Sequence, residues 1–329
     1  MSIPKIIHYC WLSGEPYPEN VQKCISSWRK FLPDYEIRLW DAKRFDWKAR
    51  LYTRQAMEQK KYAFVSDCVR LYALFHEGGI YFDSDIEAFR SFDDLLGNKA
   101  FMGFESGGRI GAWLMASEAG NPLFDELLSY YDERPFLRED GSMDLTTNTI
   151  TVTRVLIGHG LQPENTVQRL EHVKVYPEEF FCPKNPWSGE IRMTENTHCI
   201  HHFHGAWNDT ANKDMPFIRD IPRMVKKFVE RLEEEDRGCP IVIYGLGVVG
   251  RNVYECLRNS LSGNAVAGFL VTHYDSGWRK LDGLPIVELD SAGEQFKAAA
   301  VLVATIPRYH GEILEGLKKN GFMKTYCLG

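Results

Sequence analysis

The sequence contains no run of about 18 consecutive apolar residues, the length that a membrane-spanning helix needs. Its first twenty residues also lack an apolar stretch long enough for a secretory signal. We therefore expect a cytoplasmic protein, with at most peripheral contact at the inner face of a membrane.

An excess of basic charge is also missing. Lys and Arg number 39 against 45 Asp and Glu, so the net charge is −6, and a dedicated nucleic-acid partner is not expected. The eight cysteines form no CxxC pair, which leaves a zinc ribbon or a disulfide framework unsupported. Hydrophobic residues at 44% and charged residues at 26% are typical of a folded globular protein.

The length of 329 residues predicts two domains. Residues 219–237 are rich in charge, and their apolar residues have the spacing of an amphipathic helix. Gly238 and Pro240 then end the helix before a new apolar strand. We place the boundary at 237, giving domains 1–237 and 238–329.

The first domain alternates strands with helices. Strands are predicted at 5–11, 35–40 and 80–82, and helices at 20–31 and 62–76. This order predicts an α/β domain with a largely parallel sheet, whose ligands bind at the carboxyl ends of the strands. Trp11, Asp41 and Asp83 fall at such ends, so they are expected to face one cleft.

Two acidic patterns lie close together in the sequence. Asp83 and Asp85 flank one residue after an apolar strand, so both carboxylates can converge on an Mg²⁺ or Mn²⁺ ion. Asp67 and Arg70 share one face of the predicted helix 62–76. They form either a local ion pair or a carboxylate that grips sugar hydroxyls beside a guanidinium that contacts phosphate.

Three segments, KIIHYCWLSG, SDCVRLYALFHEGGIYFDSD and HHFHGAW, resemble glycosyltransferase family 32 over roughly residues 3–210. The resemblance implies a GT-A fold and a retaining hexosyltransferase of capsular polysaccharide type. It further implies Mn²⁺ or Mg²⁺, a nucleotide-sugar donor (UDP-sugar favoured, GDP-sugar as the alternative) and a saccharide or lipid-linked saccharide acceptor. A role in surface polysaccharide biosynthesis follows.

The same resemblance implies roles for individual residues. Asp67, Arg70, Asp83 and Asp85 would be catalytic, and Trp11 would stack on the donor base. The ion would be held by Asp83, Asp85 and His202. The donor-binding residues would be Cys10, Trp11, Ser66, Asp67, Arg70, Tyr81, Asp83, His202 and Trp207. The chain departs from the family at Ala206, where serine is frequent.

Some assignments stay open at this point. His198, His201, His202 and His204 form a histidine-rich segment in which His202 and His204 would share one face of a strand. We assign His202 to the metal shell or the diphosphate, expect one or two of the other histidines to be structural, and leave open that His204 replaces the phosphate contact of the absent serine. Glu105, Asp144 and Asn148 are unranked candidates for the acceptor side, and no nucleophile is identified.

The second domain begins with a strand at 241–244 and the glycine pattern Gly245, Gly247 and Gly250, followed by a predicted helix. This order predicts a short Rossmann-like sheet and either a second nucleotide site or a turn that only packs. The next strand, 265–271, has no acidic residue directly after it for a ribose, because Asp275 comes late.

Two other functions compete with a sugar transferase. The glycine pattern allows an NAD(P)-dependent oxidoreductase, although the missing acid counts against it. A non-catalytic protein that binds sugar nucleotides is the other alternative, and the intact acidic pattern argues for catalysis instead.

Overall fold

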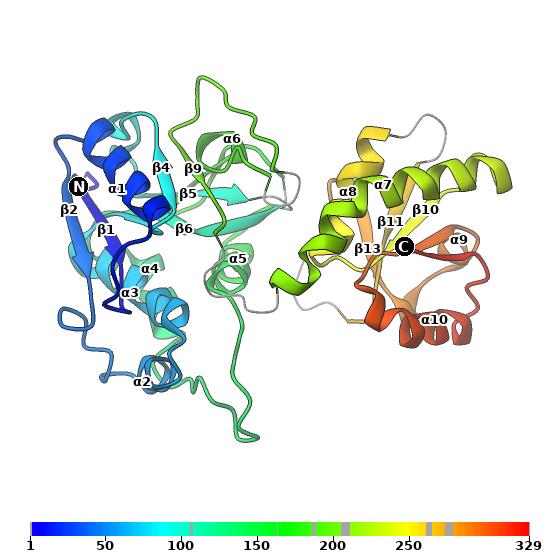
Figure 1. Cartoon of the computed structure of the whole chain (residues 1–329), viewed down its shortest axis with the longest axis horizontal. Coiled ribbons are helices and arrows are strands. Elements are labelled where there is room, and N and C mark those ends of the chain that lie inside the picture. The colour runs from blue at the N-terminus through cyan, green and yellow to red at the C-terminus, as the bar shows by residue number, and fades with distance from the viewer. Residues whose placement is uncertain are drawn as a thin grey trace. The chain divides into compact units, whose positions relative to one another are not determined.

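The computed structural model describes residues 2–105, 108–162, 164–185, 189–204, 211–260, 265–273 and 279–328. The chain divides into two compact units, Met1–Trp207 and Asn208–Gly329 (Figure 1). Among the helices of these ranges, none is both long and apolar enough to span a membrane.

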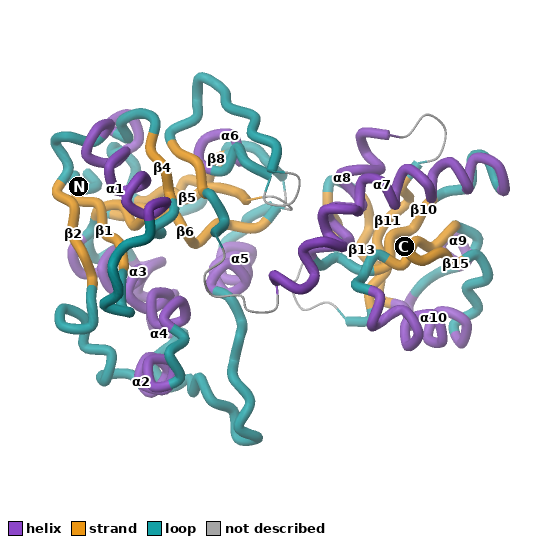
Figure 2. Tube along the Cα trace, viewed as in Figure 1, coloured by secondary structure: helices purple, strands orange, loops and turns teal. Residues whose placement is uncertain are grey.

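Both units are built from strands and helices, which confirms the predicted α/β class (Figure 2). The first unit has a seven-stranded sheet in the order β2-β1-β3-β6-β5-β8-β7. Its strands are β1 (Ile6–Cys10), β2 (Glu36–Trp40), β3 (Gly79–Phe82), β5 (Ala100–Glu105), β6 (Arg109–Ser117), β7 (Gln168–Arg169) and β8 (Lys174–Tyr176).

The sheet is mixed rather than largely parallel. Strand β1 runs parallel to β2 and β3, whereas β6 is antiparallel to both β3 and β5. The reason is the hairpin between β5 and β6, which the sequence reading did not include. A separate antiparallel pair joins β4 (Ile86–Ala88) to β9 (Cys199–His201).

Helices cover both faces of this sheet. The unit contains α1 (Glu19–Phe31), α2 (Leu51–Glu58), α3 (Tyr62–Glu77), α4 (Pro122–Ser129), α5 (Asn148–Gly158), α6 (Glu178–Phe181) and the 3₁₀ turn η1 (Asp93–Leu95). Successive residues of β3 point to opposite faces. Phe82 therefore packs on Trp28 of α1, whereas Tyr81 lies under Arg70 of α3.

Two glycines allow the tight passage from α3 into β3. Gly78 and Gly79 have φ angles of 65° and 113°, which other residues rarely adopt. A Cβ atom on Gly79 would also lie 2.7 Å from the carbonyl oxygen of Ile6 in the neighbouring strand region. The passage fixes how far Asp83 lies from the residues of α3.

The second unit has a six-stranded sheet in the order β12-β13-β11-β10-β14-β15. The strands are β10 (Ile241–Tyr244), β11 (Val266–Val271), β12 (Lys280–Leu281), β13 (Leu284–Glu288), β14 (Ala300–Val303) and β15 (Thr325–Cys327). All neighbours from β13 to β15 are parallel. This is the strand order of a five-stranded Rossmann-like sheet.

The predicted amphipathic helix is α7 (Ala211–Glu235), and it packs within the second unit. Its Phe228 ring lies 5.3 Å from that of Tyr326 on β15. The units therefore divide at 207/208, earlier than the boundary expected at 237, because the apolar face of α7 is covered by this unit. The other helices are α8 (Val248–Ser260), α9 (Glu294–Lys297), α10 (His310–Lys319), η2 (Leu289–Ser291) and η3 (Pro307–Tyr309).

A buried histidine makes the stability of the first unit depend on pH. The indole N–H of Trp40 donates to Nδ1 of His8, and Nε2 of His8 lies 2.7 Å from the carbonyl oxygen of Gly78. Nδ1 therefore accepts and Nε2 donates, which fixes a neutral imidazole. Burial lowers the pKa of His8 from 6.5 to about 4, against the raising effect of the Gly78 hydrogen bond.

We expect acid to destabilise the fold through this residue. In the unfolded chain His8 is protonated below about pH 6.5, whereas in the folded chain its pKa is about 4 and it stays neutral down to that pH. Linkage then predicts a loss of about 2 kcal/mol between pH 7 and pH 5. Urea unfolding of the wild type and His8→Gln at both pH values tests this, because the variant lacks this part of the loss. Equal losses in the two proteins would assign the pH dependence to other groups.

Candidate active site

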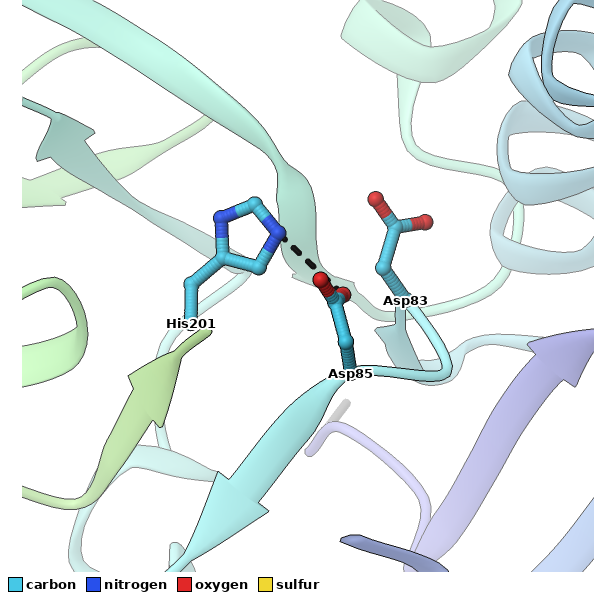
Figure 3. Close-up of side chains that lie close together, drawn as sticks. All are labelled: Asp83, Asp85 and His201. Carbon is cyan, nitrogen blue, oxygen red and sulfur yellow. Dashed lines mark ion pairs between the residues drawn. The ribbon is translucent and has the colours of Figure 1, made fainter. Parts of the chain in front are cut away.

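The loop between β3 and β4 brings the two aspartates of the DxD pattern beside a histidine from a distant segment. Asp83 follows β3, Asp85 precedes β4, and His201 ends β9. The β4–β9 register places Ile86 opposite His201, so the imidazole reaches back to Asp85. One possible ligand atom from each residue lies within 4.8 Å of the others. Figure 3 shows these side chains gathered at one point.

Within this cluster, the carboxylate of Asp85 is stabilised by neighbouring groups. Nε2 of His201 lies 3.2 Å from Oδ1 of Asp85, and the backbone N–H of His204 donates to Oδ2 at 3.0 Å. Burial would raise the pKa of Asp85, but His201 and the His204 N–H outweigh it and hold that pKa well below its usual range. Asp85 is therefore an ionised carboxylate at neutral pH.

Two carboxylates and one imidazole form a donor set that fits a divalent transition ion. Carboxylate oxygens suit Mg²⁺ and Mn²⁺, and an added imidazole nitrogen favours Mn²⁺ over the strictly oxygen-preferring Mg²⁺. The geometry also leaves coordination positions that these three residues do not fill, where substrate oxygens can bind.

Arg70 of α3 connects this cluster to Asp67. Its Nη2 atom lies 3.1 Å from Oδ1 of Asp83 and 3.2 Å from Oδ1 of Asp67. Its Nη1 atom donates to the carbonyl oxygen of Ala112 at 2.5 Å, and the guanidinium lies over the ring of Tyr81. The ion pair that the sequence left as one alternative is thus present, and it fixes a guanidinium beside the DxD residues.

Asp67 lies in an unusual electrostatic environment. Asp67 is only 7% exposed. Burial raises the pKa of its carboxyl to about 7, although the charge of Arg70 acts to lower that pKa. Asn148 donates its amide to the backbone oxygen of Asp67 at 3.1 Å. Asp67 can therefore exchange a proton near neutral pH or accept hydrogen bonds from a ligand.

The remaining residues predicted to bind the donor have different environments. Ser66 lies inside α3 and donates to Ala63, and Tyr81 is buried beneath Arg70, so both support the site from within. Cys10 ends β1, and burial raises the pKa of its thiol. The half-buried indole of Trp11 donates to the carbonyl oxygen of Glu15 and meets Tyr17 edge-on. Trp207 and Ala206 lie outside the described residues.

The choice of His202 as the metal ligand needs correction. Its Nε2 atom lies 2.8 Å from Glu87, and its ring stacks on His204, so His201 takes the place beside the aspartates. Strand β9 ends at His201, so the alternation expected for His202 and His204 does not extend to them, and Nδ1 of His204 also lies 3.8 Å from Oδ2 of Asp85. Which face meets the aspartates depends on the β4–β9 pairing, which the sequence does not display. His198 contacts Asp94 and the carbonyl oxygen of Asn196 and is structural.

The acceptor-side candidates have separate environments. Glu105 accepts a hydrogen bond from Trp113 at 3.1 Å, and its charge acts on His201. Asp144 pairs with Arg134 and accepts the N–H of Thr146, which is a structural role. Asn148 joins Asp67 instead, and its Oδ1 atom is buried with no hydrogen-bond partner among the described residues.

The glycine pattern of the second unit has two packing glycines and one open position. Gly245 has a φ of 105°, and a Cβ on Gly250 would lie 2.0 Å from the Gly245 carbonyl oxygen. Among the residues that the structure describes, none has an atom within 4 Å of a Cβ built on Gly247. At the end of β11, Thr272 bonds the Tyr244 hydroxyl at 2.5 Å, where a ribose-binding acid would be expected. Asp275 lies outside the described residues.

Known proteins share the part of the chain that holds the acidic pattern. Residues 18–102 match the family described as "Glycosyltransferase sugar-binding region containing DXD motif". This match includes Asp67, Arg70, Asp83 and Asp85 and ends well before His201. The chain therefore carries a DXD-type sugar-binding region of glycosyltransferases.

Two curated yeast proteins are similar over part of their length. Inositol phosphoceramide mannosyltransferase 3 of Schizosaccharomyces pombe is 33% identical over 126 residues, which cover 37% of this chain and 35% of that protein. Mannosyl phosphorylinositol ceramide synthase SUR1 of Saccharomyces cerevisiae is 31% identical over 145 residues, covering 41% and 37%. The chain thus spans only about a third of the length of these relatives.

A solved structure aligns over more of the chain, with low similarity. The glycosyltransferase GlyE of Streptococcus pneumoniae TIGR4 covers 99% of this chain and 91% of its own, at 9% identity and a TM-score of 0.38.

Proposed function

We propose that this protein is a metal-dependent, retaining hexosyltransferase that moves a sugar from a nucleotide-sugar donor to a saccharide or lipid-linked saccharide. The observation that carries the proposal is the cluster of Asp83, Asp85 and His201 beside the buried Asp67–Arg70 pair, within a DXD sugar-binding region. The GT-A fold and the membership of family 32 belong to the same proposal.

In this function Asp83, Asp85 and His201 hold Mn²⁺ or Mg²⁺, and the ion supplies Lewis-acid stabilisation of the leaving diphosphate. Arg70 presents a fixed positive charge to the same region, where negative charge grows as the anomeric C–O bond breaks. Asp67 accepts hydrogen bonds from the donor sugar, and Trp11 stacks on the donor base.

Retention requires the acceptor oxygen to approach from the face that the diphosphate leaves. The acceptor oxygen then forms the new bond to the anomeric carbon, and its proton passes to an oxygen of the departing diphosphate. This route needs no enzyme nucleophile, which agrees with the structural roles of Asp144 and of the Asn148 amide group.

The identities of the donor and the acceptor are further parts of this proposal. The names of both yeast relatives specify a mannosyl group and an inositol-containing ceramide, so GDP-mannose and a lipid-linked acceptor belong in the test beside UDP-sugars. A role in surface polysaccharide synthesis and a cytoplasmic location remain predictions from the sequence.

The experiment is a release assay for nucleoside diphosphate with the full chain and a panel of UDP- and GDP-sugars. We expect turnover of at least one donor with Mn²⁺, loss of turnover in EDTA and recovery when Mn²⁺ is returned. Undiminished turnover in EDTA would refute the metal role. Absence of both turnover and thermal stabilisation with every donor would refute the transferase.

We propose a second nucleotide site at the glycine pattern, because Gly247 is the one of its three glycines that packing does not require. It lies at the start of α8, beside the carboxyl ends of β10 and β14, where the strand order reverses. A pyrophosphate could approach the backbone there.

The expected result is that NAD⁺ stabilises the wild type and not Gly247→Val. A nucleotide-sugar is not the probe here, because it would also bind the proposed site at Asp83 and Asp85 in both proteins. A ligand at 100 times its Kd adds about 2.7 kcal/mol to stability, which a thermal shift detects. Gly293→Val is a matched control, since a Cβ at Gly293 also meets no atom of the described residues within 4 Å. Equal stabilisation of the wild type and Gly247→Val would leave the glycine pattern a packing turn. NAD(P)H oxidation by the full chain would instead favour the oxidoreductase.

A further inference from the structure

One tryptophan contacts both halves of the candidate metal site. Trp113 of β6 accepts the backbone N–H of Asp83 at its carbonyl oxygen, at 2.8 Å. Its indole stacks on the imidazole of His201, with the ring centroids 4.9 Å apart and the planes 24° from parallel. Asp83 and His201 come from distant parts of the sequence, and Trp113 contacts both of them.

The position of the indole is itself fixed. Trp113 is 4% exposed, and its Nε1–H donates to Oε2 of Glu105 across the β5–β6 hairpin at 3.1 Å. Gly111 lies two residues earlier on the same face of the strand. A Cβ on Gly111 would lie 2.4 Å from the indole ring, so the glycine makes room for it. Both neighbours hold the ring in one place.

His201 lacks the support that metal-binding histidines usually have. Such residues commonly donate the second ring N–H to a carboxylate or carbonyl, which fixes the ring. The Nδ1 atom of His201 is buried and finds no hydrogen-bond partner in the part of the chain that the structure describes. Its ring instead contacts two aromatic rings, those of Trp113 and of Phe203, and the centroid of the Phe203 ring is 4.0 Å away.

We propose that Trp113 is a positioning residue, which holds the His201 imidazole by aromatic stacking so that Nε2 faces Asp85. The inference rests on the proposed metal site, since it concerns how the third ligand is oriented. Stacking takes the place of the missing hydrogen bond, and the Glu105–Trp113 bond keeps the stacking surface still. Trp113 itself contacts none of the reacting atoms.

The test is calorimetric titration of the full-length protein with Mn²⁺ alone, followed by donor turnover at rising Mn²⁺. We expect Trp113→Leu to weaken Mn²⁺ binding by at least about tenfold, the effect usual for groups that orient metal ligands. Trp113→Phe keeps a flat ring and should lose less. Saturating Mn²⁺ should restore much of the turnover in both variants, which a collapsed site would not allow.

Two further variants keep the test decisive. Gly111→Ala pushes a methyl group into the indole and should weaken Mn²⁺ binding even if Trp113→Leu does not fold. Trp40→Phe removes another indole donor to a histidine, His8, and should leave Mn²⁺ binding unchanged. If folded Trp113→Leu or Gly111→Ala binds Mn²⁺ with wild-type affinity, the role of Trp113 is wrong while the proposed metal site stands. A wild type that binds no Mn²⁺ would overturn the metal site itself.

Discussion

Asp85→Asn should reduce donor turnover by more than about 100-fold while the protein stays folded. The amide keeps the shape of the side chain and one oxygen that accepts the His204 N–H, but a neutral oxygen holds a hard dication poorly. Loss of the ion removes several kcal/mol of stabilisation from the leaving diphosphate, and each 1.36 kcal/mol is a factor of about ten in rate. Turnover at saturating Mn²⁺ and unfolding in urea, measured on one preparation, give both quantities.

The cost in stability should stay below about 2 kcal/mol. His201 can release its proton when the carboxylate is gone, so no unpaired charge remains buried. Asp94→Asn is a matched control, because Asp94 also pairs with a buried histidine, His198, at 3.1 Å. It should leave turnover intact. An Asp85→Asn protein that is destabilised yet active would show that Asp85 is structural.

Arg70→Met should be the most destabilising single change in the site. Arg70 is 5% exposed and lies between two carboxylates, Asp67 and Asp83. Removal of one partner from a buried ion pair typically costs about 3–5 kcal/mol, because the other charge remains without compensation. Urea unfolding at pH 8 measures the loss, and turnover should be lost as well.

The pH dependence and a second variant identify the cause. The pKa of Asp67 is already raised to about 7 and should rise further without Arg70. When the pKa of a carboxyl is raised in the folded state, the free energy of unfolding falls as pH increases through that pKa. The loss of stability in Arg70→Met should therefore be smaller at pH 5.5 than at pH 8. Asp67→Asn added to Arg70→Met should recover part of the loss at pH 8. An equal penalty at both pH values, with no recovery, would assign the loss to packing alone.

The sequence predicted the local elements of the site well. Apolar spacing located α1 and α3, and the alternation of short apolar runs with helices located β1, β2 and β3. The positions of Asp83 and Asp85 directly after β3 followed from the same pattern. These features depend on neighbours within one or two turns of chain, which a single sequence displays.

Features set by distant pairings were missed. His201 rather than His202 meets Asp85 because of the β4–β9 register, and the sequence shows only that the two histidines face opposite ways. A tryptophan in a buried strand such as Trp113 is indistinguishable from an ordinary core residue until its neighbours are known. The apolar face of α7 was visible, but the sequence does not show which unit covers it.

The most direct test of the central claim is anomalous diffraction from crystals of the full chain grown with Mn²⁺ and the donor that the release assay identifies. A manganese peak within bonding distance of Asp83, Asp85 and His201, with the donor diphosphate on the same ion, is the predicted result. A donor bound in the DXD region with no metal at these residues, or a metal bound elsewhere, would contradict the proposed site.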